Sequence, residues 1–276
     1  MSAVAPAVPA VAGGRRLSLP RTLRSEGGIK LTTLRSTWWS IAITAALTIG
    51  IGVLIAFALT SSGEAPRGLN GIMAVVSPIQ FTALLAGILG AIAVTGEYST
   101  GMIRSTLTAD PRRGRVLVAK ATVLAVFLFL ASLVMFLISA VLVSTILGAH
   151  GQGLEWGGTP DKVILPILSA AVTMSVCALI GVSFGFLLRS GAGAIAATVG
   201  LLFVLPIMST FFAFAGGESW KWVLDAANYL PLSAAQNAIM PSDTAPLSAG
   251  AAFLTLAAWV AAGLLGSWVV LRSRDA

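Results

Sequence analysis

The sequence predicts an all-α, polytopic membrane protein with six transmembrane helices. Six long apolar runs each meet or exceed the roughly 20 residues that cross a hydrocarbon core of about 30 Å. The composition agrees, because 57% of the residues are hydrophobic and 10% are charged, against about 25% charged in soluble proteins. Charged side chains are expected to stay outside the spanning parts of these runs. The predicted spans are residues 38–60, 71–95, 116–147, 163–188, 192–215 and 247–271.

The chain is expected to hold a disordered cytoplasmic tail over residues 1–20 and one membrane domain over residues 21–276. The tail begins with an apolar stretch, but Pro6 and Pro9 interrupt it and its charges follow rather than precede it. This order does not fit a signal peptide.

Basic residues predict the orientation, because Lys and Arg in short loops are retained on the cytoplasmic side. With both termini inside, the inner segments hold 14 of the 17 basic residues and four of the ten acidic ones. We therefore expect both termini in the cytoplasm. The formal charge of +7 then reflects topology and contact with anionic lipids, and not nucleic-acid binding.

The cytoplasmic link between the second and third spans has the richest chemistry. Glu97, Gly101, Arg104 and Thr108 lie at helical spacing and predict one face of a short helix at the inner membrane surface. The Glu97 carboxylate, close to a glycine that permits close approach, favours a docking contact for a cytoplasmic partner. Its removal is expected to affect folding little.

The next residues predict a second helix that continues into the third span. Asp110 suits the N-cap of this helix and Pro111 its first position. Basic residues in its first turns oppose the helix dipole, so we interpret them as anchors to lipid phosphates. These cytoplasmic anchors are Arg112, Arg113, Arg115 and Lys120.

Other motifs carry no chemistry of their own. The single His150 has no second ligand nearby, and the lone Cys177 excludes an intrachain disulfide. Gly181 to Gly185 spells G-x-S-x-G, but within an apolar helix we interpret it as close helix packing. The sequence has no phosphate-binding loop. We expect no catalytic or metal site and no cofactor in this chain, so any energy for transport comes from another protein.

Two segments resemble a known family. The run from Glu97, E-Y-S-T-G-M-I-R-S-T-L-T-x-x-P-R-R-x-R-x-x-x-A-K, is similar to the signature segment of ABC-2 type transporter permeases, the membrane subunits of bacterial ABC exporters. Residues 23–39 resemble the amphipathic interfacial helix that precedes the first span in actinobacterial members. The resemblance implies a bacterial plasma membrane protein.

The resemblance also implies partners. Two copies of a cytoplasmic ATPase, which carry the ATP and Mg, dock beneath a permease dimer that is most simply a homodimer in membrane lipids. The segment from Glu97 to Leu107 matches the family's coupling helix, which sits in a cleft of the ATPase. We call residues 97–107 the coupling segment. Its candidate residues are Glu97, Tyr98, Gly101, Met102, Arg104 and Leu107.

Residues 216–246 match the family's outer region between the fifth and sixth spans, where short re-entrant helices close the pathway. The segment is apolar, and Pro231 and Pro241 punctuate it. Aromatic residues here suit a membrane interface. The candidate outer gate consists of Trp220, Trp222, Leu224, Tyr229 and Pro231.

Three functions stay open at the level of sequence. The first is the permease of an ATP-driven exporter, with no catalysis of its own, which moves a drug-like molecule or a lipid. The second is a regulatory or scaffolding membrane protein. The third is a passive uniporter or channel. A cavity walled by aliphatic and aromatic side chains suits lipophilic or amphipathic solutes.

Overall fold

The computed structural model describes residues 35–61, 71–102, 113–216, 220–242 and 244–273. The described part is helical throughout, apart from turns and short connections, and contains no strand. This confirms the all-α prediction. The tail expected over residues 1–20 lies outside the described residues.

Six stretches of the described chain are long and apolar enough to cross a membrane, which confirms the predicted number of spans. They consist of α3 (Arg35–Ser61), α4 (Gly71–Val76) with α5 (Ile79–Ser99), α7 (Arg113–Gly148), α8 (Ile164–Leu188), α9 (Gly191–Val199) with a π-helix (Gly200–Val204) and α10 (Leu205–Gly216), and α13 (Ala249–Ser273). Three shorter helices complete the described elements: a 3₁₀ turn (Pro160–Lys162), α11 (Lys221–Ala227) and α12 (Pro231–Ile239).

Two spans are less regular than the sequence predicted. The second span is interrupted between Val76 and Ile79, because Pro78 has no backbone N–H to donate to the preceding turn. The fifth span changes to a π-helix over Gly200–Val204 before α10 begins. A π-helix inserts an extra residue per turn, and such segments are often functional.

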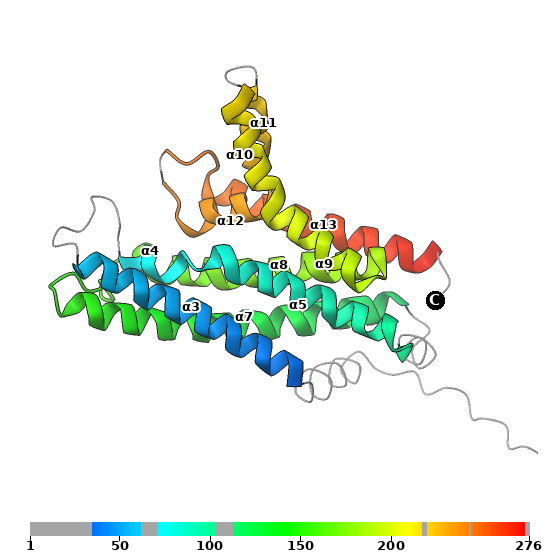
Figure 1. Cartoon of the computed structure of the whole chain (residues 1–276), viewed down its shortest axis with the longest axis horizontal. Coiled ribbons are helices and arrows are strands. Elements are labelled where there is room, and N and C mark those ends of the chain that lie inside the picture. Colours follow the sequence, from blue (N-terminus) through cyan, green and yellow to red (C-terminus); the bar gives the residue numbers. More distant parts are fainter. Residues whose placement is uncertain (1–34, 62–70, 103–112, 217–219, 243, 274–276) are drawn as a thin grey trace, which may run out of the picture.

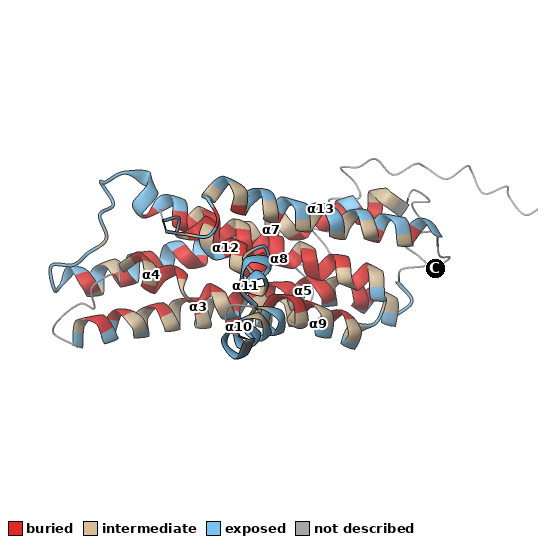
Figure 2. Ribbon diagram, turned by 90° about the horizontal axis from the view of Figure 1, so that it is seen from above, coloured by how far each residue is buried: buried red, intermediate tan, exposed pale blue. Residues whose placement is uncertain are grey.

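The long helices form a bundle, from which α10 and α11 project sideways (Figure 1). In the bundle α5 packs most extensively on α8, and α7 packs on α8 and α3. Figure 2 shows the buried residues along the middle of the bundle, whereas α10 and α11 are mostly exposed.

Glycines allow α5 and α8 to approach closely. A Cβ atom at Gly181 would lie 1.9 Å from the Gly87 carbonyl oxygen, and one at Gly90 would lie 2.0 Å from that of Ala178. A Cβ atom does not come this close to a carbonyl oxygen in real proteins, so only glycine fits at these two positions. The Ser183 hydroxyl within the G-x-S-x-G run donates to the Leu179 carbonyl in its own helix. The packing interpretation of this run is therefore confirmed.

The two ends of the bundle differ in charge. The start of α7, the turn between α8 and α9 and the end of α13 lie at one end (Figure 1), and these elements carry Arg115, Arg189 and Arg272. The opposite end holds an exposed ion pair in which Lys162 Nζ lies 2.6 Å from Glu155 Oε2. The hydrogen bond from Lys162 and its positive charge lower the pKa of Glu155.

Candidate coupling site

The coupling segment begins where α5 ends. Thr100 caps the helix, with its N–H donating to the Gly96 carbonyl. Gly101 follows with a φ of +71°, and its N–H donates to the Tyr98 carbonyl. This left-handed conformation favours glycine and turns the chain away from the helix axis. The single helical face expected from Glu97 through Arg104 to Thr108 is therefore interrupted at Gly101. Met102 is exposed, while Arg104 and Leu107 lie outside the described residues.

Glu97 is buried, with its side chain facing α7. Its Oε2 lies 2.7 Å from Lys120 Nζ, and these two side chains are 8% and 6% exposed. Lys120 Nζ also donates to the Ala93 carbonyl at 2.9 Å. One buried ion pair thus joins the last turns of α5 to the first turns of α7, the two helices that flank the coupling segment.

These positions bear on the predictions made from the sequence. Lys120 faces the protein interior rather than lipid phosphates. Glu97 faces Lys120 in the isolated chain, and its contact with a cytoplasmic partner stays a prediction. Charged residues were expected to lie outside the spans, but both lie within span-length helices. A pair in which each charge has an opposite neighbour avoids the cost of an isolated buried ion. We therefore expect removal of Glu97 alone to destabilise the fold, whereas the sequence interpretation expected little effect.

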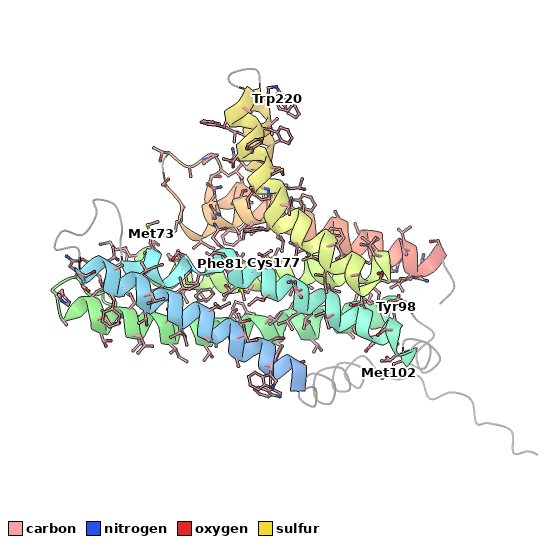
Figure 3. The ribbon with its side chains drawn as sticks, in the orientation of Figure 1. Met73, Phe81, Tyr98, Met102, Cys177 and Trp220 are labelled. Carbon is pink, nitrogen blue, oxygen red and sulfur yellow. The ribbon has the colours of Figure 1, made fainter. Side chains whose placement is uncertain are left out.

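Tyr98 connects the same end of α5 to α8. Its ring meets the Phe186 ring edge to face, with centroids 6.4 Å apart. The Arg189 guanidinium carbon lies 5.6 Å from the centroid of the Tyr98 ring, within the range of a cation–π contact. Figure 3 shows Tyr98 and Met102 together at this end of the bundle. Helices α5, α7 and α8 are thus joined at the first two residues of the coupling segment.

The remaining predicted anchors are only partly described. Arg113 is the first residue of α7 and Arg115 is half-buried, whereas Arg112 lies outside the described residues. The lipid-anchor role of these three arginines stays a prediction.

The candidate gate residues fall into two groups. Trp220 stacks on Phe212 of α10 with ring centroids 5.6 Å apart, and its ring lies 6.4 Å from that of Trp222. These rings hold α11 against α10 at the projecting tip, where Figure 3 labels Trp220. Leu224 and Tyr229 are exposed, but the Tyr229 carbonyl accepts a 2.8 Å hydrogen bond from the Trp259 indole of α13. Pro231 is buried as the first residue of α12.

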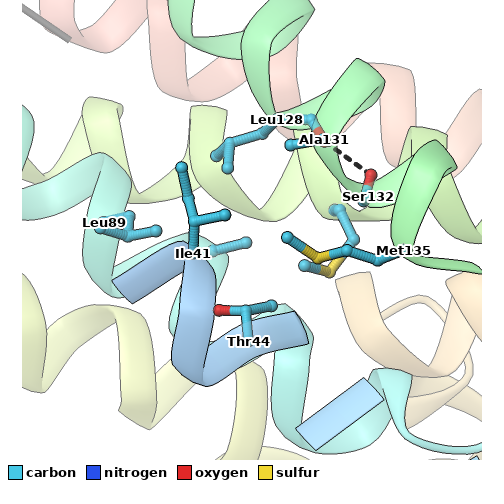
Figure 4. A pocket seen from close by; sticks show the side chains of 9 residues that line it. Ile41, Thr44, Leu89, Leu128, Ala131, Ser132 and Met135 are labelled. Atoms are coloured by element: carbon cyan, nitrogen blue, oxygen red, sulfur yellow. Dashed lines mark hydrogen bonds between the residues drawn. The ribbon is translucent and has the colours of Figure 1, made fainter. Parts of the chain in front are cut away.

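A small pocket lies among α3, α5, α7 and α8 (Figure 4). The two hydroxyl groups in its lining donate to carbonyls of their own helices: Thr44 to the Ser40 carbonyl and Ser132 to the Leu128 carbonyl. A cavity volume of about 10 Å³ accommodates one water-sized group, so the pocket in this conformation is too small for a drug-like solute. It is lined by Ile41, Thr44, Ala86, Leu89, Leu128, Ala131, Ser132, Met135 and Met174.

Sequence reasoning missed two features of this site. The first is the partnership of Glu97 and Lys120, for which a signal existed: a lysine inside an apolar run requires a buried partner. The second is Arg189, whose contact with Tyr98 depends on how α8 ends. No local pattern marks an arginine as the left-handed residue that ends a helix.

Comparison with known proteins identifies the family. A family model described as ABC-2 family transporter protein matches residues 32–205, which is more than half of the chain. This range contains the buried ion pair, the coupling segment and Arg189. A search of curated proteins gives no match. The chain belongs to the ABC-2 family of transporter proteins.

Proposed function

We propose that this chain is the permease subunit of an ATP-driven exporter, which moves a lipophilic or amphipathic solute out of the cytoplasm or the inner leaflet. ATP and Mg bind to a cytoplasmic ATPase present in two copies, and this chain performs no catalysis. Family membership supports a transporter that works with such an ATPase. The proposal places the chain in a bacterial plasma membrane with both termini in the cytoplasm.

The proposal rests on the contacts that join the end of α5 to α7 and α8. A force applied by an ATPase to the coupling segment reaches α5 directly. The ion pair of Glu97 with Lys120 passes it to α7, and the rings of Tyr98 and Phe186 pass it to α8. Three spans then move together. A regulatory scaffold or a passive channel has no need for a rigid connection of this kind at the end of α5.

The projecting arm, formed by α10 and α11, favours assembly as a homodimer. It exposes large aromatic side chains, including Phe211 at 61%, Phe214 at 90% and Trp222 at 65%. Contact with lipid would accommodate these aromatic rings. Asp225 on the same arm is also exposed, however, and exposing a carboxylate to lipid is costly. A second copy of the chain offers both apolar and polar surface.

The dimer is tested by native mass measurement of the permease with its ATPase in mild detergent. We expect two permease copies, and a shift toward one copy in the variant that combines Phe211→Ser with Phe214→Ser. Leu254→Ser is the matched control, because Leu254 is 73% exposed but lies on α13. A wild-type complex with a single permease copy would contradict the homodimer.

The apolar surroundings of the helices support a lipophilic solute. The pocket of Figure 4 is lined almost wholly by aliphatic side chains and methionines, and its two hydroxyls are bonded to their own backbone. Such surfaces offer little to an ion or a sugar, which require unsatisfied polar groups.

Reconstitution with the candidate ATPase tests the transport function. We expect the ATPase to copurify with the chain, and a fluorescent amphiphile such as a dye-labelled phospholipid to stimulate ATP hydrolysis in liposomes and to move across the bilayer only with ATP. Movement without ATP would favour a uniporter or channel. Stable insertion with neither an ATPase partner nor movement would favour a scaffold.

A further inference from the structure

Arg189 has an unusual backbone. It follows the last residue of α8 with φ 54° and ψ 11°, and its N–H donates to the Gly185 carbonyl. Among the described residues it is the one non-glycine residue with a positive φ. A left-handed conformation is strained for residues with a Cβ atom, whereas glycine adopts it freely. A glycine would therefore end α8 without strain, which raises the question of what the arginine side chain contributes.

The side chain of Arg189 reaches the end of α5. Its guanidinium lies 5.6 Å from the centre of the Tyr98 ring, and Tyr98 directly follows Glu97 of the buried ion pair. The contact links a strained turn to the residue that enters the coupling segment. Backbone strain of this kind accumulates at positions with a functional constraint.

Helix α9 begins immediately beyond Arg189. The Ser190 hydroxyl caps it by accepting the N–H of Gly193 at 3.4 Å. Gly191 lies against α5, since a Cβ there would be 3.6 Å from the Thr95 hydroxyl. The far end of α9 is the π-helix, from which α10 departs into the projecting arm (Figure 1). Helix α9 is thus a short rigid element between two irregular joints, with its first joint on the end of α5.

We propose that Arg189 is a positioning residue that connects the coupling segment to the fifth span. When the coupling segment moves, Tyr98 carries the Arg189 guanidinium with it, the turn between α8 and α9 follows, and α9 tilts as a unit that displaces α10 through the π-helix. This inference rests on the proposed function. It adds a route from the ATPase to the projecting arm that does not pass through α7.

The test follows the movement of α10 directly. In a Cys177→Ala background, Thr210→Cys places one thiol on the exposed face of α10, where an attached bimane reports its surroundings. The full chain and its ATPase are placed in liposomes, and the change in fluorescence on adding ATP, Mg and vanadate is measured. We expect Arg189→Gly to reduce this change about threefold or more, as loss of a cation–π contact requires, while ATPase affinity and thermal stability stay at wild-type values or rise.

Variants of Tyr98 separate this role from a purely structural one. Tyr98→Leu removes the ring and should reproduce the loss. Tyr98→Phe keeps the ring and should behave as wild type, since the buried Tyr98 hydroxyl has no hydrogen-bond partner among the described residues. Combining Arg189→Gly with Tyr98→Leu should lower the response no further than either change alone.

Different results would contradict the role of Arg189 and the exporter function. A wild-type response that Arg189→Gly and Tyr98→Leu both leave unchanged would overturn the assignment of Arg189 and leave the exporter intact. Failure of the wild-type chain to bind an ATPase, or to respond to ATP when bound, would overturn the proposed function and this inference with it.

Discussion

At the residue scale, burial makes Glu97 and Lys120 depend on each other. Lys120→Met removes the cation 2.7 Å from a carboxylate that remains buried, and breaking a buried pair in this way costs about 3–5 kcal/mol. Glu97→Ala should be destabilising for the same reason. The double variant Glu97→Leu with Lys120→Met should recover most of the loss, because neither charge remains to be buried. Thermal unfolding in detergent measures all three.

The double variant also tests docking by Glu97. If the carboxylate contacts the ATPase, a well-folded double variant should bind the ATPase more weakly than wild type. Normal binding would limit Glu97 to holding α5 against α7. A single Lys120→Met variant as stable as wild type would contradict the buried pair itself.

Gly101 is a second residue whose conformation determines the outcome of substitution. Its φ of +71° strains any residue with a Cβ atom, but nothing lies within 4 Å of a Cβ built there. Gly101→Ala should therefore weaken ATPase binding through the cost of the turn alone, about 1–2 kcal/mol, and Gly101→Asn should weaken it less because Asn tolerates this conformation. Titration of purified ATPase onto the chain in nanodiscs measures both affinities.

Gly101→Leu distinguishes two explanations of this effect. Nothing lies within 4 Å of a Cβ atom at this position, so backbone strain alone predicts a similar loss for Leu and for Ala. A much larger loss for Leu would show that the segment enters a narrow cleft of the partner, as the family resemblance implies.

At the element scale, helix existence was predictable and helix interruptions were not. Six spans follow from the length of apolar runs, which is a local property of the sequence. The break at Pro78 has a visible cause, but the sequence interpretation carried one helix through it because the apolar run continues on both sides. The π-helix over Gly200–Val204 has no comparable marker, since its residues are as apolar as their neighbours.

Contact between α5 and α8 gives a prediction for the glycines. Gly181→Ala and Gly90→Ala each place a methyl group about 2 Å from a carbonyl oxygen of the facing helix, so the helices must separate at a cost of about 1–3 kcal/mol or more. Gly50→Ala is the matched control. It lies within α3 with nothing within 4 Å, so the better helix propensity of alanine should leave stability equal or higher by up to about 1 kcal/mol. Thermal unfolding that shows no difference between Gly181→Ala and Gly50→Ala would contradict the close packing.

At the scale of the whole molecule, the sequence predicted where the candidate site lies but not which residues contact one another in it. Glu97, Tyr98 and Gly101 lie where α5 ends, as the motif indicated. Their contacts come from Lys120, Phe186 and Arg189, which are distant in the sequence. Only the packing of both α5 and α7 on α8 brings these residues together, and such tertiary contacts cannot be predicted from periodicity or composition. The sideways direction of α10 and α11 is likewise a tertiary property.

The orientation of the whole bundle is the last prediction. Arg113 begins α7 at the end of the bundle that carries Arg115 and Arg189, while Glu155 lies in the connection at the opposite end. Retention of basic residues inside predicts that a cysteine at position 155 reacts with a membrane-impermeant maleimide added to intact cells. A cysteine at position 113 should react only after the membrane is permeabilised. Cys177 is buried, so it contributes little background. Labelling of position 113 in intact cells would invert the topology and place the coupling segment out of reach of any cytoplasmic ATPase.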